Sequence, residues 1–112
     1  MRKDDLVYVG QMLDTARKAV LKVQGRTRAN CERDEDICIV LAHLVQVIGE
    51  AARKVSDEFC AQHPEIPWSE IVGMRHKIVH DYMELDTDIV LDVVWVELPL
   101  LIEKLRLMVK DV

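Results

Sequence analysis

The sequence predicts an all-α fold: a single domain, spanning residues 1–112, built as an up-and-down bundle of four or five helices. Half of the 112 residues are hydrophobic, which is enough for one core and too little for two. Only four Gly and three Pro are available for turns, and this favours long helices over many short strands. Apolar residues recur at three- and four-residue steps through most of the chain, as they do in amphipathic helices that pack into bundles.

The first helix is expected from about Asp4 to Gln24. Its apolar face consists of Leu6, Val9, Leu13, Ala16, Val20 and Val23. Gly25 follows the last apolar position and is typical of a residue that ends a helix. Residues 26–32 are polar and predict a short connection, with Asn30 as a candidate N-cap.

The second helix is expected from about Arg33 to Gln62. Gly49 in its interior costs about 1 kcal/mol of helix propensity relative to Ala, and close packing against a second backbone would compensate for that cost. Glu50 lies in the same patch of small residues. It is either exposed or buried, and a buried carboxylate would need a partner, for which Arg75 is the candidate.

Pro64 and Pro67 break the second helix, because proline lacks an amide hydrogen and clashes with the preceding turn. The third helix is expected to begin at Trp68 and to end near Asp81 or Tyr82.

The fourth helix is expected to start near Ile89, after capping residues at 86–88. Its first half, residues 89–96, is rich in β-branched residues and taken alone could be a strand. Pro99 and the helical spacing of Leu101 and Leu105 instead favour a helix that kinks or restarts at residues 97–98.

The net charge of −5 gives no sign of a broadly basic surface, so any nucleic-acid contact must be local or shared between subunits. Cys31, Cys38 and Cys60 are odd in number and form no CxxC pair, which favours reduced thiols in a cytoplasmic protein. We find neither a signal peptide nor an apolar run long enough to span a bilayer, so no membrane association is expected.

The densest polar cluster lies within residues 73–82 and comprises Arg75, His76, Lys77, His80, Asp81 and Tyr82. Arginine offers a permanent cation with a planar fork of donors that suits phosphate. Histidine can take or give a proton near neutral pH. The cluster therefore predicts an active site mounted on a helix.

Helical spacing poses a difficulty for such a site. On one continuous helix Arg75 and Tyr82 share a face, as do His76 and His80. Arg75 and His80, five positions apart, point about 140° away from each other. For the two to converge, the helix must loosen near His80, the Arg75 side chain must wrap round, or a second subunit must complete the site.

Structural roles are the alternative for each residue. Arg75 could pair with Asp81 or Glu70 on the surface, where such pairs contribute little. His80 could pack at a helix end, and Tyr82 could cover the edge of the core with its hydroxyl in water.

A metal site is a further alternative, since His76 and His80 have the spacing of a helical ligand pair. The sole third ligand nearby is Asp81, so we predict no metal and no cofactor.

The pattern Arg-x4-His-x-Tyr, formed by Arg75, His80 and Tyr82, resembles the signature of HEPN-domain ribonucleases and specifically of the HepT-like toxins. Residues 48–52, Ile-Gly-Glu-Ala-Ala, resemble the second-helix motif of that family. Residues 63–68, His-Pro-Glu-Ile-Pro-Trp, resemble its loop before the catalytic helix. The resemblance covers nearly the whole chain, its three motifs stand in the family's order, and it implies a HEPN-like bundle.

The resemblance implies a metal-independent endoribonuclease in which the RNA 2′-hydroxyl attacks the adjacent phosphate. The resemblance also implies that Arg75 and His80 are the catalytic pair. His80 would move the proton, and Arg75 would stabilise the charge that develops on phosphate. The need for a 2′-hydroxyl explains a preference for RNA over DNA. Supporting or substrate-binding roles fall to His76, Lys77, Asp81 and Glu50.

The resemblance also implies the toxin of a toxin–antitoxin system. Its partner would be an MntA-like nucleotidyltransferase antitoxin that binds a nucleotide and silences the enzyme by adenylylating Tyr82. An added phosphodiester would compete with RNA for Arg75. A homodimer with facing motif helices is implied as well. It would gather two copies each of Arg75 and Lys77 in one cleft, which would reconcile an acidic chain with an RNA substrate.

The chain departs from the family pattern at one position: His76 stands where the family usually has Asn directly after the Arg. This departure supports the alternative hypothesis, a non-catalytic helical dimer that serves as a partner-binding subunit of a nucleotidyltransferase.

Overall fold

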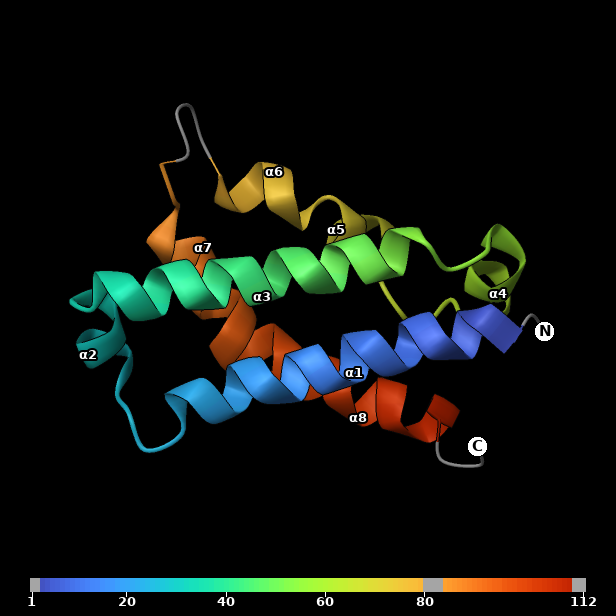
Figure 1. The fold of residues 1–112 in the computed structure, drawn as a ribbon, viewed down its shortest axis with the longest axis horizontal. Helices are drawn as coiled ribbons and strands as arrows, with labels where there is room; N and C mark the ends of the chain where they lie inside the picture. The colour runs from blue at the N-terminus through green and yellow to red at the C-terminus, as the bar shows by residue number, and fades with distance from the viewer. Residues whose placement is uncertain (1–2, 80–83, 110–112) are drawn as a thin grey trace.

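The computed structural model describes residues 3–79 and 84–109. Its two longest helices, α1 (Lys3–Val23) and α3 (Glu35–Arg53), run antiparallel side by side, and α8 (Leu98–Val109) packs along α1 (Figure 1). The remaining helical segments are α2 (Arg28–Glu32), α4 (Asp57–Gln62), α5 (Trp68–Val72), α6 (Met74–Ile78), α7 (Thr87–Asp92) and the π-helical η2 (Val93–Glu97). The predicted all-α bundle is thus confirmed.

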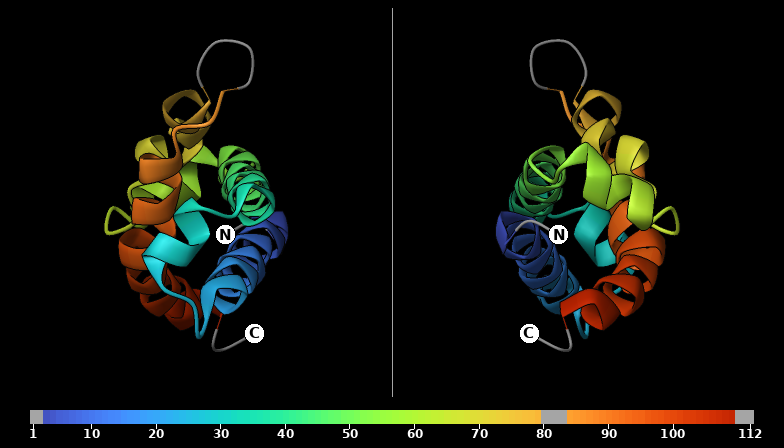
Figure 2. Two further views of the ribbon diagram at one scale, coloured as in Figure 1. Left: turned by 90° about the vertical axis from the view of Figure 1, so that its left-hand side faces the viewer. Right: turned by 90° about the vertical axis from the view of Figure 1, so that its right-hand side faces the viewer.

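Two layers of helices enclose the core. Seen end-on, α1 and α3 form one side, α7, η2 and α8 form the other, and α5 and α6 cover one edge (Figure 2). The buried residues form one continuous aliphatic cluster in which Phe59 is the only fully buried aromatic side chain of the described residues. In this part of the chain, no helix is both long enough and apolar enough to cross a lipid bilayer.

Helix α1 begins and ends close to the predicted positions. Asp4 and Asp5 lie in its first turn and Lys22 in its last, so each charge complements the helix dipole. Gly25 follows with φ = 79°, a left-handed conformation that costs glycine little. The predicted role of Gly25 as the residue that ends this helix is confirmed.

The connection at residues 26–32 is not entirely irregular, because it contains the short helix α2. Thr27 caps α2: its hydroxyl oxygen accepts a hydrogen bond from the Asn30 N–H at 3.1 Å. The prediction of Asn30 as a cap was therefore wrong, and Asp34 caps α3 by accepting from the Ile37 N–H at 3.2 Å. Thr, Asn and Asp are all good N-caps, so the local sequence did not decide between them.

The single helix predicted over residues 33–62 was wrong, because the chain breaks between α3 and α4. Ser56 caps α4, with its hydroxyl accepting from the Phe59 N–H at 3.2 Å. The Ser56 N–H and O–H in turn donate to the carboxylate of Asp5 at 2.8 and 2.7 Å. Asp5 is only 2% exposed. A contact from α1, distant in sequence, thus fixes this break.

Gly49 marks a close approach of α3 to α5. A Cβ atom added at Gly49 would lie 2.9 Å from the carbonyl oxygen of Ile71. The expected close packing at this glycine is confirmed, and α5 and α6 lie directly against α3 because of it.

The loop at residues 63–67 separates α4 from α5 as predicted, and Trp68 begins α5. The indole N–H of Trp68 donates to the carbonyl oxygen of His63 at 3.0 Å, and the His63 ring lies 4.4 Å from that of Phe59. These contacts fix where α5 starts.

The third helix ends earlier than predicted and is divided at Gly73 into α5 and α6. Helix α6 ends at Ile78, and Val79 is extended (φ −114°, ψ 117°) and forms an isolated antiparallel bridge with Leu85. The Asp86 N–H donates to the Ile78 carbonyl oxygen at 2.8 Å. The prediction of an end near residues 81–82 was wrong, because the returning chain takes the place of a further helical turn.

The fourth helix begins as predicted. Asp86 caps α7 by accepting from the Ile89 N–H at 3.2 Å. The β-branched run that could have been a strand continues as α7 and then η2, where the Leu98 N–H donates to the Val93 carbonyl oxygen with the five-residue spacing of a π-turn. The expected restart at residues 97–98 is confirmed. Pro99 lies in the first turn of α8, where its missing N–H is tolerated.

Candidate functional site

Helix α6 presents its polar residues because its apolar residues face inward. Met74 and Ile78 are 7% and 0% exposed and belong to the core. The intervening Arg75, His76 and Lys77 are exposed. These apolar neighbours tie the segment to the core, and the partly buried Val79 also packs against it.

A polar hollow of about 200 Å³ lies between α3 and the α5–α6 segment. Helix α3 contributes Gln46, Gly49, Glu50 and Arg53 to its wall. The α5–α6 segment contributes Val72, Arg75 and His76. The close approach at Gly49 makes this hollow, because it brings the polar face of α3 beside Arg75.

Glu50 is an exposed acid that pairs with Arg53 one turn further along α3. The Arg53 guanidinium donates to both carboxylate oxygens, through Nη2 at 2.5 Å and Nε at 3.4 Å. This hydrogen bond is the main cause of a lowered pKa for Glu50, and the positive charges of Arg53, Lys54 and Arg75 lower the pKa further. Of the two predicted environments for Glu50, the exposed one is correct. Arg75 acts on it only through its charge.

Arg75 holds no partner within residues 3–79 and 84–109. Its guanidinium forms no hydrogen bond or ion pair there, and the predicted surface pair with Glu70 does not form. The alternative partner, Asp81, lies outside the described residues. Arg75 therefore lines the hollow without being neutralised by Glu70.

His80, Asp81 and Tyr82 lie outside the described residues, so their predicted roles stay predictions. The structure does bear on the helical spacings used for them. Because α6 ends at Ile78, two positions before His80, the 140° separation from Arg75 has no basis. The shared faces expected for Arg75 with Tyr82 and for His76 with His80 assumed the same continuous helix, and they stay predictions because His80 and Tyr82 lie outside the described residues.

His76 and Lys77 differ in their relation to the hollow: His76 lines it, whereas Lys77 is exposed outside its wall. Among the described residues, no group of three or more His, Cys, Asp or Glu side chains is placed to hold a metal ion.

A second hollow, of about 140 Å³, lies between α3, α5 and α8 and is almost wholly apolar. Its one cation, Lys104, donates to the carbonyl oxygen of Glu65 at 3.0 Å. Glu97 is the only other charged residue among the described residues of its lining, which include no arginine, histidine or side-chain amide, and we therefore assign the chemistry to the polar hollow beside Arg75.

Sequence reasoning missed Gln46 and Arg53. Both could have been found from their spacing to Glu50, because positions three and four apart share a helix face. The pattern of positions 46, 49, 50 and 53 describes the α3 wall of the hollow completely.

Comparison with known proteins identifies the family. A family model described as Ribonuclease HepT-like matches residues 12–108, which include every residue that lines the polar hollow. This chain belongs to the HepT-like family. The resemblance inferred from the sequence motifs is thereby confirmed.

Similar proteins carry names of the same kind. A protein of Thermococcus cleftensis named as a probable ribonuclease HepT is 34% identical over 79 residues, covering 68% of this chain and 70% of its own. A protein of Caldanaerobacter subterraneus, provisionally named as an RNase, is 27% identical over 82% of each chain. Another provisionally named RNase, from Methanocaldococcus jannaschii, is 22% identical over 99% of this chain and 92% of its own. No solved structure matches this HepT-like chain.

Proposed function

We propose that this HepT-like chain is an endoribonuclease that cleaves RNA without a metal ion, with Arg75 and His80 as its catalytic residues. One observation carries the proposal: the exposed guanidinium of Arg75 has no partner among the described residues and borders a polar hollow that holds a second arginine. An unneutralised planar cation is suited to bind and stabilise a phosphate in a transition state.

In the proposed reaction the 2′-hydroxyl of RNA attacks the adjacent phosphorus, and the bond from phosphorus to the 5′-oxygen breaks. The 2′-hydroxyl proton is removed, and a proton is given to the leaving 5′-oxygen. His80 takes part in this transfer as general base or acid. Arg75 stabilises the negative charge on the non-bridging oxygens. The products are a 2′,3′-cyclic phosphate and a 5′-hydroxyl.

Arg53 and Glu50 extend the phosphate-binding surface. Glu50 is a carboxylate at neutral pH, its pKa is lowered further by its hydrogen bond with Arg53, and it holds the Arg53 guanidinium at the wall of the hollow. An incoming phosphate competes with this carboxylate for Arg53, since both are bidentate acceptors for the same fork of donors. We assign His76 and Lys77 supporting roles on α6, and Asp81 one beside His80.

We further propose that two copies of the chain associate with their motif segments facing each other, which doubles the cations offered to RNA. An MntA-like nucleotidyltransferase antitoxin would silence the toxin in the cytoplasm by adenylylating Tyr82. The added phosphodiester would introduce negative charge next to the motif and compete with RNA for Arg75.

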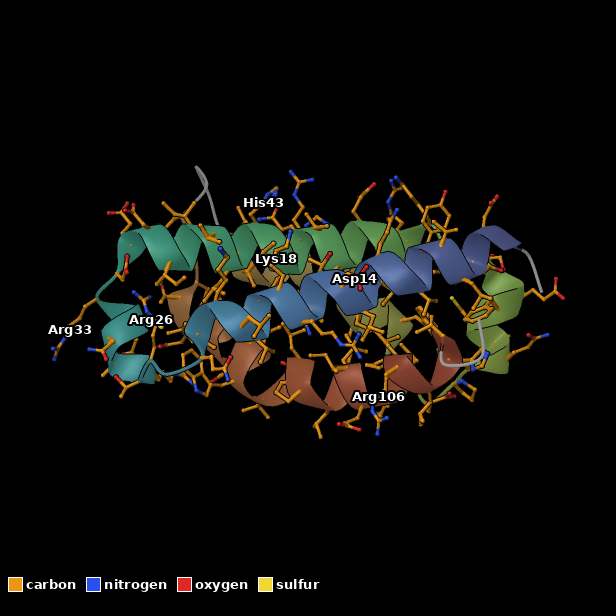
Figure 3. All side chains as sticks on the ribbon, turned by 60° about the horizontal axis from the view of Figure 1, so that its bottom comes forward. Asp14, Lys18, Arg26, Arg33, His43 and Arg106 are labelled. Atoms are coloured by element: carbon orange, nitrogen blue, oxygen red, sulfur yellow. The ribbon has the colours of Figure 1, made fainter. Side chains whose placement is uncertain are left out.

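The test is cleavage of a short RNA by the purified protein in the presence of EDTA. We expect wild type to cleave, and Arg75→Ala and His80→Ala each to lose at least about 100-fold in rate. Arg106→Ala is the control for the loss of a surface arginine outside the hollow: Arg106 pairs with Glu103 and projects from α8 at the opposite edge from His43 of α3 (Figure 3). A wild-type protein that leaves RNA intact with EDTA would remove the proposal.

A non-catalytic, partner-binding role is the second candidate, favoured by His76, which stands directly after Arg75 and lines the hollow. It predicts a stable complex with a nucleotidyltransferase and no cleavage of RNA by any variant.

A further inference from the structure

We propose that the polar hollow is a base-recognition subsite, in which Gln46 reads the edge of the nucleobase next to the cleaved linkage. The inference rests on the proposed ribonuclease function and adds to it a preference for one base. It arises from the composition of the hollow, which includes an apolar residue and a neutral amide that a site for phosphate alone would not need.

Besides the Glu50 carboxylate and the His76 ring, the wall of the hollow combines three kinds of surface. Arg53 and Arg75 are cationic, Val72 is apolar and 37% exposed, and Gln46 is a neutral amide. Cations alone would suffice to hold a phosphate. An apolar surface beside a hydrogen-bonding amide is what a nucleobase needs, since its face is apolar and its edge carries donors and acceptors.

Gln46 has the free hydrogen-bonding capacity that such reading requires. Its side chain is half-buried on α3, and within the part of the chain that the structure describes its amide forms no hydrogen bond. A glutamine amide offers a donor and an acceptor side by side and matches the paired acceptor and donor on an adenine edge. Glu50 cannot take this role, because it is ionised, accepts only, and is already bonded to Arg53.

The spacing along α3 agrees with a single nucleotide lying across the hollow. Gln46 and Arg53 are seven positions apart on one face, about 10 Å along the helix axis. A phosphate near Arg53 and a base edge at Gln46 can therefore belong to the same nucleotide. Gly49 lies between them along α3 and also lines the hollow.

The test uses four short oligonucleotides that are 2′-deoxy everywhere except at one ribonucleotide, so that only one linkage is cleavable. They differ only in the base next to that linkage. We expect wild type to cleave the adenine substrate roughly tenfold faster than the least favoured one, as one bidentate base contact allows. Gln46→Ala should reduce that ratio to about twofold or less by slowing cleavage of the adenine substrate, and Gln46→Glu should behave likewise because it lacks the donor.

Gln11→Ala is the matched control, because Gln11 is an exposed amide in the middle of α1 outside the hollow. It should retain the wild-type ratio. Binding of the corresponding all-deoxy oligonucleotides, followed by fluorescence anisotropy, provides a readout that does not need cleavage. Circular dichroism melts confirm that each variant is folded.

The outcomes separate the subsite from the ribonuclease. Equal cleavage of all four substrates by wild type, or a preference that Gln46→Ala retains, overturns the subsite and leaves the ribonuclease standing. Base-dependent binding that Gln46→Ala abolishes, without any cleavage, supports the subsite and removes the ribonuclease. Neither cleavage nor base-dependent binding overturns both.

Discussion

Replacing Gly49 by alanine tests how α3 positions the α5–α6 segment. The new Cβ would lie 2.9 Å from the Ile71 carbonyl oxygen, a backbone atom that cannot rotate away. Alanine gains about 1 kcal/mol of helix propensity over glycine. Overpacking a fitted contact typically costs about 1–3 kcal/mol. The clash therefore outweighs the gain, and we expect a net loss of about 1 kcal/mol.

Gly10→Ala is the matched control, because Gly10 lies in α1 and a Cβ there would meet no heavy atom within 4 Å. It should gain the propensity without the clash and become more stable by about 1 kcal/mol. For a chain of this size, 1 kcal/mol shifts Tm by about 4 °C, so the two variants should differ by about 8 °C.

Calorimetry or circular dichroism melts measure both shifts. Gly49→Ala should also slow RNA cleavage more than Gly10→Ala, since relief of the clash moves α5 and with it the α6 residue Arg75. A Gly49→Ala protein that melts above wild type, as Gly10→Ala should, would refute the close approach of α3 and α5 on which the hollow depends.

Two further predictions concern carboxylates. Asp5→Ala removes the acceptor for both donors of Ser56 and should lower the free energy of unfolding by about 2–3 kcal/mol, read from urea denaturation; an unchanged midpoint would show that Asp5 does not hold the break between α3 and α4. The pKa of Glu50 is lowered in the folded protein. Its ionised form therefore stabilises the fold at any pH above the ordinary pKa of glutamate, and this contribution is lost as the pH falls through the lowered pKa. The Tm advantage of wild type over Glu50→Gln should accordingly be present at neutral pH and disappear in acid; an advantage that grows in acid would reverse the sign of the reasoning.

The sequence by itself determined the features that depend on neighbours within one or two turns. The apolar period placed the buried faces of α1 and α3. Gly25 and Asp86 ended and began helices where their residue types predict, and the chain restarted at Leu98 as Pro99 indicated. Motif order was sufficient to predict the HepT-like family. Helix periodicity, caps and short motifs act locally, so a single sequence reveals them.

The tertiary structure decided the features that need two distant segments to meet. The carboxylate of Asp5 fixes the break before α4, 51 positions away at Ser56. The Asp86 N–H donates to the carbonyl oxygen of Ile78, the residue at which α6 ends. The helical pattern of the sequence predicted that this helix would extend further.

The polar hollow arises in the same way. Gln46 and Arg53 of α3 become neighbours of Arg75 only because Gly49 lets two backbones approach. Their side chains look like an ordinary solvated helix face in the sequence, since nothing local records which helix will pack beside them. The chain thus encodes its helices and family locally, and the assembly of its candidate site resides in contacts that only folding creates.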